Sequence, residues 1–143
     1  HNVLTRQDQR LFKKYLAILD GVPFKKQGRI AEPIDRSPDS IIKRCVSKTG
    51  KPSITNYKIL KTQDNLSLAE ITTLTGRTHQ IRVHMAHIGT PIFRDWLYGN
   101  GSESQSGHLL HVSDINFIHP LTKKRMNIHA PMPKDMTDIF SSV

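Results

Sequence analysis

Residues 74–89 hold the densest group of side chains in this chain that could bind a charged ligand. Two arginines, three histidines and a glutamine follow a Thr-Gly turn: Arg77, His79, Gln80, Arg82, His84 and His87. Arg77 stands near an expected helix start, where the dipole and the free amides already favour an anion. We therefore expect Arg77 to meet a carboxylate or a phosphate. The alternative is a solvated arginine in a turn.

The three histidines also raise the possibility of a metal site. His84 and His87 are three residues apart, whereas zinc ligands on one helix are usually four apart and recruit a carboxylate or a cysteine. No carboxylate lies between Glu70 and Asp95, and Cys45 is the sole cysteine. The pattern favours histidines that form hydrogen bonds or face RNA, with no metal.

The same stretch predicts a helix over residues 78–88. Ile81, Met85 and Ile88 recur at helical spacing and are expected to pack inward. A threonine, Thr75 or Thr78, is expected to cap the first turn. Gly89 suits the left-handed position that ends a helix, and a proline follows two residues later.

The rest of the chain reads mainly as strands. Residues 3–12 resemble the end of a helix, and residues 28–38 are rich in turn formers. Alternating or apolar runs predict strands at 14–19, 29–30, 41–47, 53–61, 66–74, 108–112, 115–118 and 126–129. Many strands, few helices and no regular βαβ alternation predict an α+β fold with a mixed, largely antiparallel sheet.

Length and charge limit the function further. The 143 residues suit one domain, and no apolar run approaches the roughly 20 residues that cross a bilayer. The net charge of +9 and basic clusters spread along the chain favour a polyanionic partner, and RNA fits. One cysteine fits a reducing, cytoplasmic location. The first residues carry no initiator methionine, so we expect a piece of a longer protein.

The motif resembles that of a known family. Leu74–His84, read as Leu-Thr-Gly-Arg-Thr-His-Gln-Ile-Arg-Val-His, followed by Ile88–Ile92 and Asp95–Gly99, closely resembles the signature of the RluA-type RNA pseudouridine synthases. Segments at 14–21, 50–57 and 109–133 are also similar to that family. The resemblance implies the pseudouridine synthase type of catalytic domain, with residues 1–143 forming its carboxy-terminal portion.

The implied chemistry is isomerisation of uridine to pseudouridine in structured rRNA or tRNA, with no cofactor and no metal. The family's nucleophilic aspartate lies in a His-Arg-Leu-Asp segment followed by Thr-Ser-Gly. No aspartate in this sequence stands in that context. We therefore expect the 143 residues to be inactive by themselves.

The resemblance also implies roles for particular residues. Tyr15 matches the tyrosine that lies against the target base, and Arg77 matches the arginine that pairs with the catalytic aspartate. Leu74 and His111 are expected to line the pocket. Contacts with RNA are expected from Lys13, Lys14, His79, Gln80, Arg82 and Arg94.

Three positions depart from the family pattern: Thr90, Arg94 and Val112. Arg94, which stands where the family usually has glycine, is either a further phosphate contact or the sign of a changed substrate site. Two functions other than an enzyme also fit the sequence. One is a non-catalytic RNA-binding module on the same fold, and the other is a protein-interaction domain whose association is insensitive to salt.

Overall fold

A computed structural model describes residues 11–104 and 107–141. The central feature is a six-stranded sheet in the order β2-β5-β6-β1-β7-β8, in which every pairing is antiparallel. Its strands are β1 (Leu11–Asp20), β2 (Gln27–Ile30), β5 (Thr55–Gln63), β6 (Leu66–Thr73), β7 (Leu110–Ile118) and β8 (Arg125–His129). The α+β prediction is confirmed. The predicted helix at residues 3–12 lies outside the described residues, except that positions 11 and 12 begin β1.

Strand β1 shows how the sheet acquires two apolar faces. Successive side chains of a strand point to opposite faces. Ala17 and Leu19 therefore pack into one cluster with Ile71 of β6, and Ile18 packs into the other with Leu68. Each fully buried Leu or Ile contributes roughly 1.5–3 kcal/mol to stability. Helix α1 (Gln80–His87) covers the first face, and the carboxy-terminal segment covers the second.

Helix α1 confirms most of the local prediction. Ile81 and Met85 are buried in the first cluster, Ile88 packs against it, and Gly89 has a φ of 88°. The predicted threonine cap is wrong. His79 occupies the N-cap position with a φ of 56°, and no side chain caps the first turn.

A small second sheet was missed by the turn-rich interpretation of residues 28–38. It pairs β3 (Ile34–Arg36) with β4 (Arg44–Val46), the latter lying within the predicted strand 41–47. Lys51 forms a bridge with Ile34 that holds the β3–β4 hairpin to the following chain. Gly50 is needed here because a Cβ would lie 2.5 Å from the carbonyl carbon of Ile34.

Strand β7 is continuous where two short strands were predicted. Val112 pairs with Tyr15 and Asp114 pairs with Lys14, so Ser113 is the extra residue of a β-bulge. The Ser113 hydroxyl donates to the Lys14 carbonyl at 3.2 Å. This bulge allows a polar Ser-Asp pair to interrupt the apolar pattern without ending the strand.

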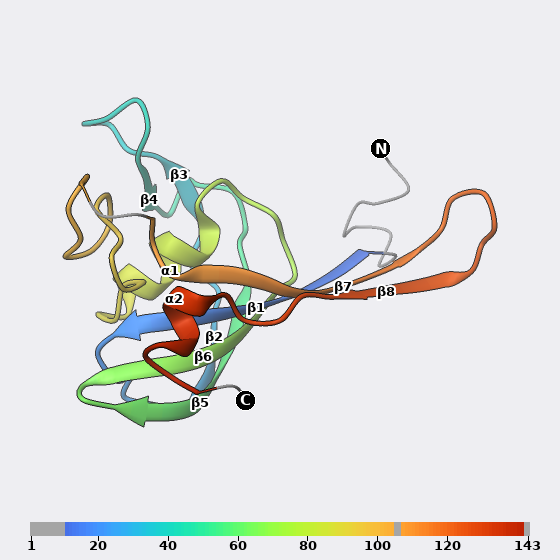
Figure 1. Ribbon diagram of the computed structural model, residues 1–143. Helices are drawn as coiled ribbons and strands as arrows, with labels where there is room; N and C mark the ends of the chain where they lie inside the picture. Colours follow the sequence, from blue (N-terminus) through green and yellow to red (C-terminus); the bar gives the residue numbers. More distant parts are fainter. Residues whose placement is uncertain (1–10, 105–106, 142–143) are drawn as a thin grey trace.

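The hairpin of β7 and β8 extends well beyond the rest of the sheet (Figure 1). All five residues of β8 are exposed. After β8 the chain returns to the sheet, where α2 (Lys134–Thr137) places Met136 in the second apolar cluster with Phe140. None of the helices among residues 11–104 and 107–141 is both long and apolar enough to cross a membrane.

Candidate active site

A cavity of about 390 Å³ opens between β1, the start of β7 and the segment that leads into α1. It is lined by Lys13, Tyr15, Thr73, Thr75, Gly76, Arg77, His79, Gln80, Ile81, Arg82, His108 and Leu110. Tyr15 and Arg77, which are 62 positions apart in sequence (77 − 15), therefore face the same space. The cavity is where most of the residues singled out in the sequence converge.

The loop before α1 is held by Gln80, whose side chain is only 4% exposed. Its Oε1 accepts hydrogen bonds from the Thr75 hydroxyl at 2.6 Å and from the Arg77 amide at 3.1 Å. Its Nε2 donates to the Ile54 carbonyl and to the Thr55 hydroxyl, both at 2.9 Å. The Gln80 amide therefore joins the loop, through Oε1, to the start of β5, through Nε2, and the expected contact of Gln80 with RNA remains a prediction.

Arg77 is anchored by one backbone contact. Its Nε donates to the Pro52 carbonyl at 2.9 Å. Throughout the part of the chain that the structure describes, Arg77 forms no ion pair and its Nη groups form no hydrogen bond. The side chain therefore offers a charged, two-pronged donor at the wall of the cavity.

A buried chain of hydrogen bonds, Thr55–His84–Glu32, fixes the position of α1. The His84 Nε2 lies 2.8 Å from the Glu32 carbonyl, which can only accept, so this nitrogen carries the proton. The Thr55 hydroxyl then donates to Nδ1 at 2.7 Å. Burial, opposed by the Glu32 carbonyl, lowers the pKa of His84 below its ordinary value, so the ring is neutral near pH 7. His84 is structural and does not face RNA.

Arg82 and Asp95 form a second internal anchor. The guanidinium donates to both carboxylate oxygens, at 2.8 and 2.9 Å, and the Arg82 side chain is only 11% exposed. Asp95 Oδ1 also accepts from the amides of Leu97 and Tyr98. Burial alone would raise the pKa of Asp95, but the bonds from Arg82 and these amides lower it. Asp95 therefore holds the Arg82 guanidinium within the protein, and the expected contact of Arg82 with RNA remains a prediction.

His79 reaches the cavity from a strained left-handed position at the N-cap. Its Nδ1 lies 2.7 Å from the Tyr98 hydroxyl, which also accepts from the Arg44 amide at 2.8 Å. The hydroxyl still has its own proton to donate to Nδ1, and in that tautomer the proton of His79 lies on Nε2. Burial, followed by the charges of Arg82 and Arg44, lowers the pKa of His79.

His108 is a cavity residue that the sequence analysis missed. It precedes β7 and lines the cavity beside Leu110. Burial and then the charge of Arg82 lower its pKa, so a neutral imidazole faces the ligand space near pH 7. In the sequence, His108 directly precedes Leu109-Leu110-His111, and of the two histidines only His111 was predicted to line the pocket.

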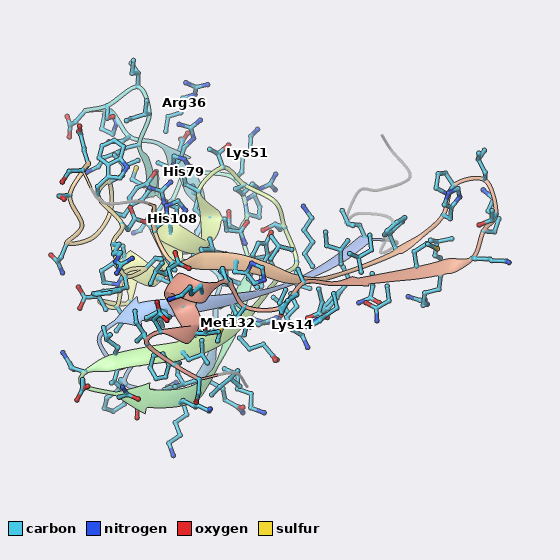
Figure 2. All side chains as sticks on the ribbon, in the orientation of Figure 1. Lys14, Arg36, Lys51, His79, His108 and Met132 are labelled. Carbon is cyan, nitrogen blue, oxygen red and sulfur yellow. The ribbon has the colours of Figure 1, made fainter. Side chains whose placement is uncertain are left out.

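Four predicted site residues are not among those lining this cavity: Lys14, Leu74, Arg94 and His111. Lys14 and His111 belong to the opposite face of the sheet, where Lys14 pairs with Glu70 at 3.6 Å and His111 Nε2 donates to the Ala130 carbonyl at 3.0 Å. Figure 2 shows Lys14 and Met132 away from His79 and His108.

Leu74 and Arg94 fall outside the cavity for different reasons. Leu74 is 52% exposed to solvent, just before the loop that Gln80 anchors. Arg94 has a φ of 65°, and its guanidinium carbon lies 5.7 Å from the centre of the Phe93 ring. The expected pocket role of Leu74 and His111 is better matched by Leu110, which does line the cavity.

The lining suits a flat, polar-edged ring attached to an anionic chain. Tyr15 offers an aromatic face, His79 and His108 offer ring nitrogens, and Lys13 and Arg77 supply positive charge. No acidic side chain of the described residues lines the cavity. Those residues also contain no group of three or more His, Cys, Asp or Glu side chains placed to hold a metal ion.

Known proteins are similar to this chain in sequence and in fold. The family described as RNA pseudouridylate synthase matches residues 1–87. The uncharacterized RNA pseudouridine synthase YjbO of Bacillus subtilis is 36% identical over 142 residues, covering 98% of this chain and 50% of that protein. Ribosomal large subunit pseudouridine synthase D of Haemophilus ducreyi is 32% identical over 157 residues, covering 100% of this chain and 48% of the relative.

A solved structure, human RNA pseudouridylate synthase domain containing 1, superposes with a TM-score of 0.77 at 27% identity. The match covers 87% of this chain and 56% of that structure. The chain thus spans about half the length of the curated relatives it matches.

Proposed function

The chain belongs to the RNA pseudouridylate synthase family, of the RluA type, and on that premise we propose that it forms the substrate-binding part of an enzyme that isomerises uridine in RNA. In this reaction the N1–C1′ bond of uridine breaks and a C5–C1′ bond forms. The C5 proton is lost and N1 gains one, so the product is an isomer of the substrate. No cofactor is required for that balance.

The observation that carries the proposal is the shared cavity of Tyr15 and Arg77. Tyr15 would lie against the uracil ring after the nucleotide leaves its stack. Arg77, which has no ion pair among the described residues, would bind and orient the carboxylate nucleophile. This contact would satisfy the cation at the helix entrance.

The substrate is proposed to be rRNA or tRNA in the cytoplasm. Support comes from the net charge of +9 and from relatives whose names specify the ribosomal large subunit. A single cysteine fits a reducing compartment.

The test is to map pseudouridine in rRNA and tRNA from cells that lack the gene. We expect at least one modified position to disappear and to return when the wild-type gene is supplied. An Arg77→Met gene is expected not to restore it. If the deletion changes no position in either RNA, the synthase proposal fails.

The second candidate is a non-catalytic RNA-binding module. It is favoured by one observation, the lack of an acidic side chain among the described residues of the cavity. Under this alternative, deletion would leave every pseudouridine in place, while the purified full-length protein would still bind RNA with strong salt dependence.

A further inference from the structure

A second cavity, of about 340 Å³, lies on the other side of the loop that carries Arg77. It is lined by Ile34, Asp35, Arg36, Arg44, Lys51, Gly76, Arg77 and Thr78. Four of these side chains are cationic and one is acidic. Arg77 has its role in the proposed chemistry, but neither the sequence motif nor that chemistry accounts for Arg36, Arg44 and Lys51.

The small second sheet holds the cations in place. Arg36 of β3 and Arg44 of β4 are direct partners in the antiparallel register, so their side chains lie on the same face. Lys51 is fixed beside them because its amide donates to the Ile34 carbonyl at 2.9 Å and Ile34 returns a bond at 3.0 Å. Figure 2 shows Arg36 and Lys51 at this end of the molecule.

The charges of this group are not neutralised within the described residues. None of Arg36, Arg44 and Lys51 belongs to an ion pair there. Asp35, the acidic residue in the lining, accepts instead from the backbone amide of Arg36 at 2.7 Å. Like charges around one small cavity repel each other unless an anion enters, and arginine forks match phosphate oxygens well.

The two cavities are neighbours. Gly76 and Arg77 line both of them, and the Tyr98 hydroxyl joins His79 of the first to the backbone of Arg44, which lines the second. A strand whose base occupies the first cavity would therefore carry its adjoining backbone across the loop toward Arg36 and Arg44.

We propose that the second cavity binds a phosphodiester of the same RNA strand, next to the nucleotide whose base enters the Tyr15 cavity. The inference rests on the proposed function and deepens it, because it names the group that holds the strand beside the target. Arg36 and Arg44 supply the phosphate contacts, and Lys51 adds a third positive charge.

The test uses the full-length protein as it is encoded and a fluorescein-labelled oligouridylate of about 12 nucleotides, within the usual range of single-strand site sizes. Affinity is measured from about 50 to 200 mM salt. For Arg36→Gln/Arg44→Gln we expect roughly tenfold weaker binding and a salt slope smaller by about 0.7 for each phosphate that the protein no longer neutralises.

The matched control is Lys58→Gln/Lys61→Gln, which removes the same charge from exposed positions of β5. We expect affinity and slope close to wild type. Arg36→Lys/Arg44→Lys should retain most of the salt slope but only part of the affinity. Lysine keeps the positive charge but lacks the two-pronged guanidinium of arginine. Melting temperatures equal to wild type will show that the variants fold.

Equal affinity and slope for the Arg→Gln double variant and for the control would overturn the inference. Two competition results would also overturn it. One is that inorganic phosphate binds without displacing the RNA. The other is that polyglutamate binding requires Arg36 and Arg44 while RNA binding does not. Pseudouridine formation in rRNA and tRNA is measured in parallel with the same proteins. Its absence in the wild type with the slope change intact would reject the proposed function and leave the phosphate site standing.

Discussion

The Arg77 side chain is held by the Pro52 carbonyl, and its guanidinium has no ion pair among the described residues. Replacement by Met removes the positive charge but keeps the length of the stem. In the full-length protein we expect Arg77→Met to lower kcat by at least about a hundredfold, the scale of losing one electrostatic anchor of a reacting group. RNA affinity should fall by no more than the removal of one phosphate interaction would cause. Single-turnover kinetics with parallel binding measurements will separate the two effects.

Arg77→Lys is the conservative comparison for that result. Lysine keeps the charge but cannot form a two-pronged contact with a carboxylate, so an intermediate rate is expected. Wild-type turnover for Arg77→Met would contradict the assigned ion pair.

Tyr15 is expected to act through its ring. Tyr15→Leu removes the aromatic surface on which the base stacks, and stacking on a side chain is worth about 1–3 kcal/mol per base. We expect turnover to fall by at least tenfold, measured as pseudouridine formed per enzyme at saturating RNA.

Tyr15→Phe separates the ring from the hydroxyl, because it keeps the stacking surface. A rate for Tyr15→Leu equal to that of wild type would give Tyr15 a purely structural role, as part of the apolar cluster it packs against.

At the scale of elements, the Arg82–Asp95 pair joins α1 to the segment before β7. Asp95→Asn leaves a buried guanidinium without its counter-charge, and breaking such a pair destabilises proteins by about 3–5 kcal/mol. Urea unfolding will measure the change. Lys134→Gln, which breaks an exposed pair with Asp138, is the control and should shift stability by less than about 0.5 kcal/mol.

The Thr55–His84–Glu32 chain of hydrogen bonds predicts a pH dependence of stability. Because burial lowers the pKa of His84 in the folded protein, the unfolded chain binds the proton more readily. The stabilising contribution is complete above pH 6.5, the ordinary value, and is lost as pH falls through the lowered pKa. We expect the Tm to fall between about pH 7.5 and 5.

His84→Gln provides the comparison for this pH profile. It should lower the Tm at pH 7.5, because buried hydrogen bonds are removed, and it should also flatten the profile. An unchanged profile in this variant would show that other groups, including His79 and His108, account for the dependence.

The elements themselves were largely predictable from sequence. Helical spacing located α1, and alternation located β5 and β6, because each has one face on the apolar clusters. The β-bulge at Ser113 was not predictable, since its two-to-one pairing is set by β1. The same holds for β3, whose strand conformation depends on β4 and on the close approach of Gly50.

The chemistry of individual side chains was less predictable than their grouping. Tyr15 and the segment entering α1, both singled out in the sequence, line one cavity. The sequence could not show that Gln80 and Arg82 form hydrogen bonds within the protein. Their partners Ile54, Thr55 and Asp95 are 13 or more positions away in the sequence. The sequence also could not place Lys14 and His111 on the opposite face, which depends on register.

For the whole molecule, the distribution of groups predicts binding without turnover. The 143 residues carry the cavity and the net positive charge, but no aspartate in a His-Arg-Leu-Asp context. Produced by themselves, they are expected to bind RNA with affinity that falls steeply from about 50 to 200 mM salt. They are expected to form no pseudouridine in a mass-spectrometric assay of RNA nucleosides. Pseudouridine formed by these residues alone would require a different nucleophile.

The position of β1 in the sheet has a consequence for synthesis on the ribosome. β1 is the first described strand, yet it lies between β6 and β7, which end at Thr73 and Ile118. After β6 leaves the ribosome, one edge of β1 stays open until roughly 45 further residues are made, a delay of about 2–9 s at 5–20 residues per second. During that interval the nascent chain exposes unpaired amides beside an incomplete apolar layer, and this is when a chaperone would have most to protect.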